Sequence, residues 1–341
     1  MNGSAPISEE ARKLHYSSIV IDGCTFFCEG YNDQLARAGV TALNLTTPDV
    51  EADAGWAVRE IASCYRVIRE DPRLILIETV EDIFRAKAAG KVGLIIAFQN
   101  ARPMADNPAM VEVFYRLGAR VSLLSYNDRN FAADGCATDA NAGLSRDGVA
   151  LVREMNRIGM VVDLSHVGER SSLEAIEVSE KPCLFSHSNP RQRVGALRNI
   201  TDEQMQKVAA KGGVVGLTTY PPLNWKGGKA NPLLGDFLDH MQYTIDLIGI
   251  DHVSIGTDTE ATPGAYPREY KQRLARKVAG TLGGYPQAFQ GNPAAGRLEG
   301  FASMADFPLI TQGLLDRGYD EESIQKVLGL NLIRVFREVW R

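Results

Sequence analysis

The chain has 341 residues, of which 45% are hydrophobic. That is enough to bury a large core, and we expect a single (β/α)8 domain over residues 1–341. The net charge of −5 argues against nucleic acid or an anionic membrane as a partner. The five cysteines form no CxxC pair, which indicates reduced thiols rather than disulfides. Residues 1–18 lack the features of a secretory signal, and no apolar run has membrane-spanning length. We therefore expect a cytoplasmic protein.

Apolar runs alternate with helical patterns along most of the chain. Strands are expected at 18–22, 40–45, 92–98, 120–125, 160–166, 183–187, 213–218 and 252–256. Helices are expected to begin near Ser8 and to cover 56–69, 80–89, 110–117, 146–158, 169–180, 201–211 and 234–248. Thr79 is expected as the N-cap of the helix at 80–89 and Thr201 as the N-cap of the helix at 201–211. Continuous apolar runs between helices are typical of a parallel sheet buried on both faces, and eight strands are the number that a closed α/β TIM barrel requires.

The C-terminal part of the chain departs from this alternation. Residues 263–300 are rich in Gly, Pro and Ala, which predicts an insertion above the barrel rim. Two helices, at 304–315 and 321–340, are expected to end the chain. No further repeat, linker or low-complexity tract is evident.

Two histidines stand at the ends of successive apolar runs. Residues 160–166 and 183–187 both end in Ser-His, so His166 and His187 are expected on neighbouring strands at the same rim. Functional groups collect at the carboxyl ends of parallel barrel strands. A lone histidine there most often bonds only to backbone. Two of the five histidines at equivalent strand ends instead favour a metal site.

Other polar residues follow the remaining strands: Gln99, Tyr126, Asn127 and Asp258, with Arg198 eleven residues beyond the sixth strand. Two imidazoles with a carboxamide or carboxylate can hold one Zn²⁺ that keeps an open position for water. Asp258 could accept a proton from that water, and Arg198 could pair with a substrate carboxylate. Each has a simpler alternative: a turn cap for Asp258, a surface ion pair for Arg198 and a loop hydrogen bond for Gln99.

The ordered series of motifs resembles the membrane (renal) dipeptidase family of metallopeptidases. The motifs are 162–166 (VDLSH), 185–188 (FSHS), 198–199 (RN) and 255–258 (IGTD), with 19–23 (IVIDG) and 329–336 (GLNLIRVF) near the two ends. The resemblance implies a (β/α)8 barrel, commonly dimeric, that hydrolyses dipeptides with two bridged Zn²⁺ ions. By position, His166 and His187 match the ligands of one zinc. Asp258 matches the acidic residue of the last strand, and Arg198 the arginine that binds the substrate carboxylate.

Four positions depart from the family pattern. The family's His-x-Asp pair, which binds the other zinc, is replaced by Cys24 and Phe26. The bridging glutamate falls on Gln99, a neutral and weaker ligand, and a substrate-contacting histidine falls on Tyr126. A phenyl ring cannot bind a metal, and Cys24 alone is not expected to hold one without partners. The chain is similar to a divergent bacterial branch that lacks the pair.

We therefore expect a hydrolase of a small amide, dipeptide or dipeptide-like, that bears a carboxylate. One Zn²⁺ per chain would be held by His166 and His187 with Gln99, and Tyr126 and Asn127 would line the substrate site. A homodimer is implied by the resemblance. The alternative is a barrel that has lost peptidase chemistry and serves another reaction or binds a ligand. Cys24 as a nucleophile is disfavoured, because only the two strand-end histidines are expected near it.

Overall fold

The computed structural model describes residues 7–105, 107–228, 230–265 and 298–341. The strands are β1 Ile21–Phe26, β2 Ala42–Thr46, β3 Leu74–Leu76, β4 Val92–Phe98, β5 Ala119–Leu123, β6 Val161–Asp163, β7 Leu184–Phe185, β8 Val214–Leu217, β9 Val253–Ile255 and β10 Thr259–Glu260. The α-helices are α1 Glu9–Ser17, α2 Asp33–Ala38, α3 Ala54–Glu70, α4 Val80–Ala88, α5 Met110–Arg116, α6 Arg146–Ile158, α7 Glu169–Val178, α8 Asp202–Ala210, α9 Pro221–Asn224, α10 Leu234–Ile248, α12 Phe307–Asp316, α13 Glu321–Gln325 and α14 Asn331–Val339.

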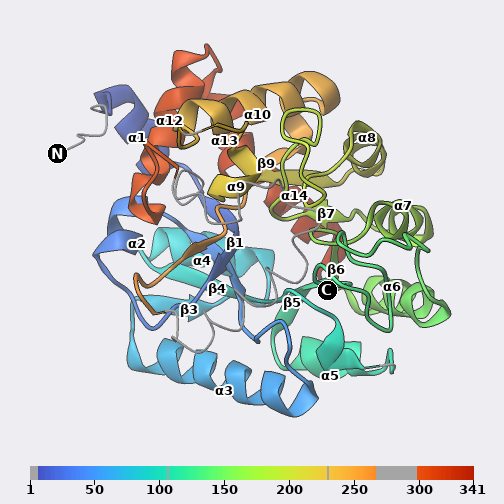
Figure 1. Ribbon diagram of the computed structural model, residues 1–341. Helices are drawn as coiled ribbons and strands as arrows, with labels where there is room; N and C mark the ends of the chain where they lie inside the picture. Colours follow the sequence, from blue (N-terminus) through green and yellow to red (C-terminus); the bar gives the residue numbers. More distant parts are fainter. Residues whose placement is uncertain (1–6, 106, 229, 266–297) are drawn as a thin grey trace.

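The strands form the expected (β/α)8 barrel. Neighbours pair in parallel in the order β1-β2-β4-β5-β6-β7-β8-β9, and the helices surround them (Figure 1). The ring closes where the Asp258 backbone N–H donates to Cys24 O at 2.9 Å and β10 pairs in parallel with β1. This closure matters for function because it brings the first and last strands, and the residues that follow them, to one rim.

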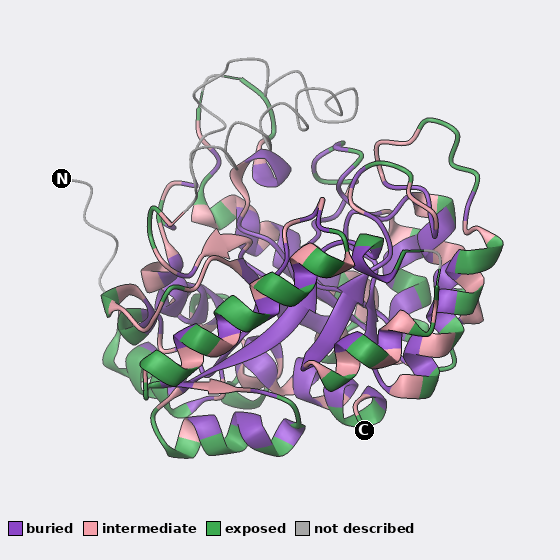
Figure 2. Cartoon of the chain, turned by 90° about the horizontal axis from the view of Figure 1, so that it is seen from below, coloured by how far each residue is buried: buried purple, intermediate pink, exposed green. Residues whose placement is uncertain are grey.

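Apolar side chains pack on both faces of the strands, as the continuous apolar runs predict. In β4 all seven residues are buried; Ile95 and Ala97 belong to one cluster, and Leu94, Ile96 and Phe98 to the other. The helices bury the face that meets the strands and expose the opposite one (Figure 2). No helix in the described parts of the chain is both long and apolar enough to cross a membrane.

Local capping places two helices where the sequence predicts them. The Thr79 side chain accepts a hydrogen bond from Asp82 N at the start of α4, and Thr201 accepts one from Gln204 N at the start of α8. In both helices, the side chain of that third residue accepts a hydrogen bond from the backbone N–H of the N-cap threonine, which completes a capping box. The two N-cap predictions are confirmed.

The prediction of one continuous helix at 321–340 is wrong. The region is divided into α13, a π-helical segment Lys326–Leu330 and α14, and α14 ends before Trp340. Gly329 packs so closely on the Ile19 carbonyl that a Cβ there would come within 2.6 Å of it. Directly after the π-helical segment, Asn331 Nδ2 donates to the carbonyls of Ile250 and Val253, both at 2.8 Å. The helix is thereby tied to the start of β9.

Other boundaries also differ from expectation. The first strand begins at Ile21 rather than Ser18, because Ser18 caps the C-terminus of α1. Strand β3 was not expected. It pairs with the first residues of β4, and β5 pairs with the last residues of β4 on the same edge. The helix expected at 304–315 is a 3₁₀ turn, Met304–Asp306, followed by α12. Most of the expected insertion, residues 266–297, lies outside the described part of the chain.

Candidate functional site

The carboxyl ends of the strands bring the expected site residues together. His166 lies just after β6 and His187 just after β7, and their Nε2 atoms are 3.0 Å apart. Both are buried, at 6% and 0% exposure. Gln99 follows β4 and Asp258 follows β9 on the same rim. The structure therefore places both imidazoles on one rim, each in the turn beyond its strand rather than inside it.

Each imidazole is oriented through its Nδ1 atom. His166 Nδ1 lies 2.7 Å from Asn127 Oδ1, an oxygen that can only accept, so Nδ1 carries the proton. His187 Nδ1 lies 2.6 Å from Ser186 Oγ. Burial, together with the charge of Arg198, holds the pKa of both histidines well below the usual value, so both rings are neutral. The two Nε2 atoms are the ends of the rings left for a ligand.

These residues fit a metal ion. A ligating histidine binds the metal through one nitrogen and a second partner through the other, and both rings are arranged in this way. One donor atom from each of Cys24, His187 and Asp258 also lies within 4.8 Å of the other two. Cys24, for which the sequence suggests no partner, thus has two neighbours with metal-binding side chains.

Gln99 contacts Cys24 rather than the histidines. Its Nε2 donates to Cys24 Sγ at 3.2 Å and to Thr46 Oγ1 at 2.8 Å. On the other side, Cys24 Sγ donates to Asp258 Oδ1 at 3.6 Å. Burial raises the pKa of the thiol well above its usual value, and the carboxylate of Asp258 adds to this rise. As the chain stands, Cys24 is a protonated donor between an amide and a carboxylate.

Asp22 holds the first strand against the end of the last one. Its Oδ1 accepts from the backbone N–H of Thr257 at 2.8 Å and of Cys24 at 3.2 Å, and its Oδ2 accepts from Thr257 Oγ1 at 2.5 Å. It is fully buried, and burial raises its pKa to about 7. Asp22 thus positions Cys24 and the residue before Asp258. The sequence shows it only as part of a motif, with no sign of this role.

Asp163 holds together the ends of the two strands that carry the histidines. At the end of β6, its Oδ1 accepts from the backbone N–H of Ser165 and of Ser186, both at 3.0 Å. The side chain is 1% exposed, and burial raises its pKa. Because Ser165 and Ser186 directly precede His166 and His187, one carboxyl group sets the spacing of the two imidazoles.

Three site residues have left-handed backbone. The φ angles are +57° at Asn127, +64° at His166 and +59° at Asp258. Residues other than glycine rarely adopt this conformation, and it persists where surrounding contacts enforce it, often at functional sites. Asn, His and Asp adopt it more often than other non-glycine residues, but nothing in the sequence shows that these three do so.

The residues expected to bind substrate surround the histidines. Arg198 is 2% exposed, and its guanidinium donates to Ser188 Oγ at 2.7 Å and to His187 O at 2.6 Å. The Tyr126 ring stacks on His166, with centroids 4.0 Å apart. Asn127, expected to contact substrate, is fully buried, and its Oδ1 is used by His166. Burial raises the pKa of Tyr220 above its usual value, and the charge of Asp258 adds to this rise; the sequence does not single out this residue.

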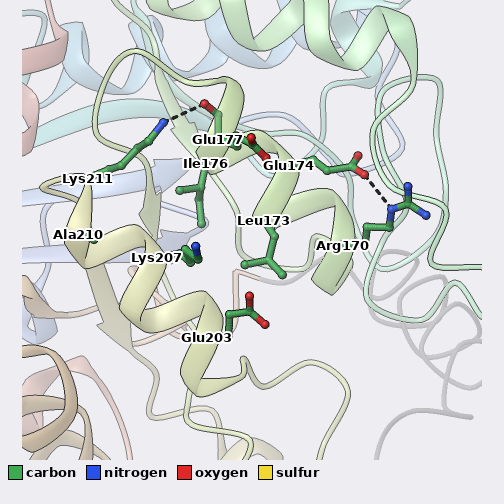
Figure 3. A pocket seen from close by; sticks show the side chains of 9 residues that line it. All are labelled: Arg170, Leu173, Glu174, Ile176, Glu177, Glu203, Lys207, Ala210 and Lys211. Atoms are coloured by element: carbon green, nitrogen blue, oxygen red, sulfur yellow. Dashed lines mark hydrogen bonds and ion pairs between the residues drawn. The ribbon is translucent and has the colours of Figure 1, made fainter.

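A separate groove lies on the helical layer between α7 and α8 (Figure 3). Its volume is about 460 Å³, and it is lined by Arg170, Leu173, Glu174, Ile176, Glu177, Glu203, Lys207, Ala210 and Lys211. Arg170 is ion-paired with Glu174 at 2.8 Å, and Lys211 donates to Glu177 O at 2.9 Å. None of these residues belongs to the strand-end site.

A barrel with two neutral histidines and a carboxylate at the carboxyl ends of its strands has the architecture of the barrel metallohydrolases. Within this class, the chain belongs to the membrane dipeptidase family, peptidase family M19, whose profile matches residues 47–272 and 276–341. The resemblance noted in the sequence is thereby confirmed.

Individual relatives agree with this assignment. Dipeptidase verJ of Clonostachys rogersoniana is 30% identical over 80% of this chain and 61% of its own length. Dipeptidase tcpJ of Claviceps purpurea is 28% identical over 78% of this chain and 56% of its own length. The chain therefore matches little more than half of these relatives. An amidohydrolase structure from Pseudomonas aeruginosa superimposes with a TM-score of 0.85 at 33% identity, over 97% of this chain and 99% of the other.

Proposed function

We propose that this chain hydrolyses a small amide, a dipeptide or dipeptide-like compound with a free carboxylate, with one Zn²⁺ bound at His166 and His187. The observation that carries the proposal is the pair of buried, neutral imidazoles whose Nε2 atoms face each other at 3.0 Å. Membership of the dipeptidase family and the names of the fungal relatives support the reaction class.

The residues around the ion would divide the work. A bound zinc would supply a Lewis acid and lower the pKa of its water. Asn127 and Ser186 hold the imidazoles by their Nδ1 atoms, and Tyr126 restricts the His166 ring by stacking on it. These three side chains are positioning residues.

Proton transfer and substrate orientation fall to two charged residues. Burial raises the pKa of Asp258, which brings this carboxylate closer to the range where it can accept a proton near neutral pH. Arg198, beside His187, would pair with the substrate carboxylate through the planar fork of its guanidinium. Together they would orient a substrate against the reacting water.

The replacements at the other metal position support one ion rather than two. Phe26 cannot ligate a metal, and its ring packs edge-on against Phe27 at 5.9 Å. Gln99 is neutral and turns its amide nitrogen toward Cys24. The same replacements favour a second candidate, a barrel that binds a related ligand without cleaving it.

Metal content and turnover test the proposal together. Protein purified without chelator should contain about one zinc per chain, and a panel of dipeptides and N-acyl amino acids should include a substrate. Chelation should abolish turnover, and zinc should restore it. Two tightly held equivalents of zinc would contradict the single site. One equivalent with saturable binding but no turnover across the panel would favour the second candidate.

A further inference from the structure

Two positions that depart from the family pattern lie in contact. Gln99 donates its amide N–H to the Cys24 sulfur at 3.2 Å, although the two residues are 75 positions apart. A glutamate at position 99 would repel a thiolate at position 24, whereas a carboxamide can stabilise one by hydrogen bonding. The glutamine at position 99 is therefore compatible with a thiolate at position 24. The two replacements are better explained as a matched pair than as two independent losses of metal ligands.

The Cys24 sulfur also lies among metal-binding groups. Donor atoms of Cys24, His187 and Asp258 all lie within 4.8 Å of one another, although they follow or belong to different strands. His187 uses Nδ1 for Ser186, so its Nε2, which lies 3.0 Å from His166 Nε2, is the nitrogen that can face an ion. Cys24 is buried at 2% exposure and is not in a disulfide. Sulfur, nitrogen and oxygen donors thus converge from three directions.

We propose that Cys24 is a metal ligand that binds, as a thiolate, the same ion as His187. The inference rests on the proposed function only in that both place an ion at this histidine. On binding, the Sγ–H proton would pass to Asp258, to which the thiol already donates, and then to solvent, because Asp258 is partly exposed. Gln99 becomes a hydrogen-bond donor to the ligand, not a ligand itself.

A thiolate narrows the choice of metal. Soft sulfur ligands select zinc and similar ions over magnesium, calcium or manganese, which prefer oxygen. Thiolate, imidazole and carboxylate together form a donor set that zinc accepts. A carboxylate has two oxygens, so Asp258 can lie at the ion with one and still accept a proton with the other.

Cobalt substitution tests the sulfur ligand directly. The Co²⁺ form of the wild type should show an intense thiolate-to-metal charge-transfer band in the near ultraviolet. In Cys24→Ser the band should vanish, and metal affinity should fall by more than about 100-fold, the upper end for loss of an outer partner. Cys64→Ser is the matched control, because Cys64 is buried on α3 in the helical layer; it should keep both band and affinity.

Gln99→Leu tests whether Gln99 is itself a metal ligand or only donates a hydrogen bond to the ligand Cys24. If Gln99 only donates to the sulfur, the variant should keep the charge-transfer band and lose about 10- to 100-fold in metal affinity. An unchanged band and affinity in Cys24→Ser would overturn the proposal.

X-ray absorption of the wild-type zinc form needs no variant. It should show one sulfur at about 2.3 Å beside the lighter ligands. A zinc ion bound only by nitrogen and oxygen would overturn the Cys24 ligand and leave the proposed function standing. Sulfur-bound zinc without hydrolysis of any amide would instead contradict the proposed function alone. Protein that binds no zinc would overturn both.

Discussion

The buried guanidinium of Arg198 is held in a fixed position at the site by hydrogen bonds. Its guanidinium makes two hydrogen bonds, to Ser188 Oγ and to the carbonyl of His187. Both partners lie at the end of β7, so the cation has a defined place beside the histidine. A buried cation of this kind needs an anion nearby, and Asp258 or a substrate carboxylate can serve.

We expect Arg198→Lys to weaken binding of carboxylate ligands by about 10- to 100-fold, because an ammonium cannot reproduce the two-pronged contact, worth about 1.5–3 kcal/mol. The measurement is KM or the inhibition constant for a dipeptide against its C-terminal amide, with zinc content checked. Arg193→Lys is the control: Arg193 lies in the same loop, partly exposed, 3.8 Å from Asp239. Equal losses of affinity for the dipeptide and for its amide would show that Arg198 does not bind the carboxylate.

At the scale of elements, single carboxyl groups and caps join neighbouring strands and helices. Asp163 bridges the turns after β6 and β7, and Asp22 bridges β1 to the segment after β9. Gly216 and Gly256 leave room for the carbonyl of Ser186, with which a Cβ at either position would collide. The position of the histidines thus depends on how three strand ends fit together.

Asp163→Ala should lower the free energy of unfolding by about 2–6 kcal/mol, because it leaves two buried N–H groups without an acceptor at about 1–3 kcal/mol each. Asp163→Asn keeps the accepting oxygen and should cost less than about 1 kcal/mol. Urea denaturation of the two variants and the wild type gives the comparison. If the alanine and asparagine variants were equally stable, Asp163 would not be the acceptor that joins these turns.

His15 makes the docking of α1 sensitive to pH. Its ring lies between Thr311 Oγ1 at 2.7 Å and Ala38 O at 2.8 Å, and burial lowers its pKa to about 4. The unfolded chain takes up the proton below about 6.5, but the folded chain does not until about 4. The contribution of this histidine is therefore fully present above pH 6.5 and is lost as the pH falls, by about 2 kcal/mol at pH 5.

The corresponding experiment compares wild type with His15→Gln by urea denaturation at pH 7 and pH 5. Glutamine can still donate to the Ala38 carbonyl, but it does not titrate. The variant should lose about 2 kcal/mol less between the two pH values than the wild type does. Groups common to both proteins cancel in this difference. Parallel pH dependence would exclude His15 as the source of the effect.

For the whole molecule, barrel closure determines what the rim can bind. Cys24 and Asp258, 234 residues apart, meet because the segment after the last strand returns to the first one. The family's second metal position is carried by that first strand, where Phe26 now stands. The metal count is therefore a property of the closed ring rather than of any one strand.

Restoring the family's ligands with Cys24→His, Phe26→Asp and Gln99→Glu should raise zinc content from about one equivalent toward two. Because the three act as one site, each change alone should add no zinc, and Phe26→Asp alone should destabilise the chain by introducing an unpaired charge. Elemental analysis and thermal unfolding, with and without chelator, provide the readout. A triple variant that still holds one zinc would show that other features of the rim limit the count.

The sequence by itself determined most of the elements and their order. The strand 92–98 and the helices 146–158 and 234–248 have the predicted bounds, and the N-caps at Thr79 and Thr201 are where the side chains indicate. These features are local: burial of one face, or capping of one turn, depends on residues within a few positions. The strand-end placement of the two histidines follows from the same alternation.

Only the tertiary structure decided which side chains meet at the rim. The Gln99–Cys24 contact, the bridges from Asp22 and Asp163, and the left-handed turns at His166 and Asp258 have no local signature. They depend on strand register and on closure of the ring, which join residues far apart in the chain. Strand β3 and the π-helical segment likewise depend on neighbours that no local pattern can report. Periodicity records which face of an element is buried, but the partner on that face is selected by the packing of the whole barrel.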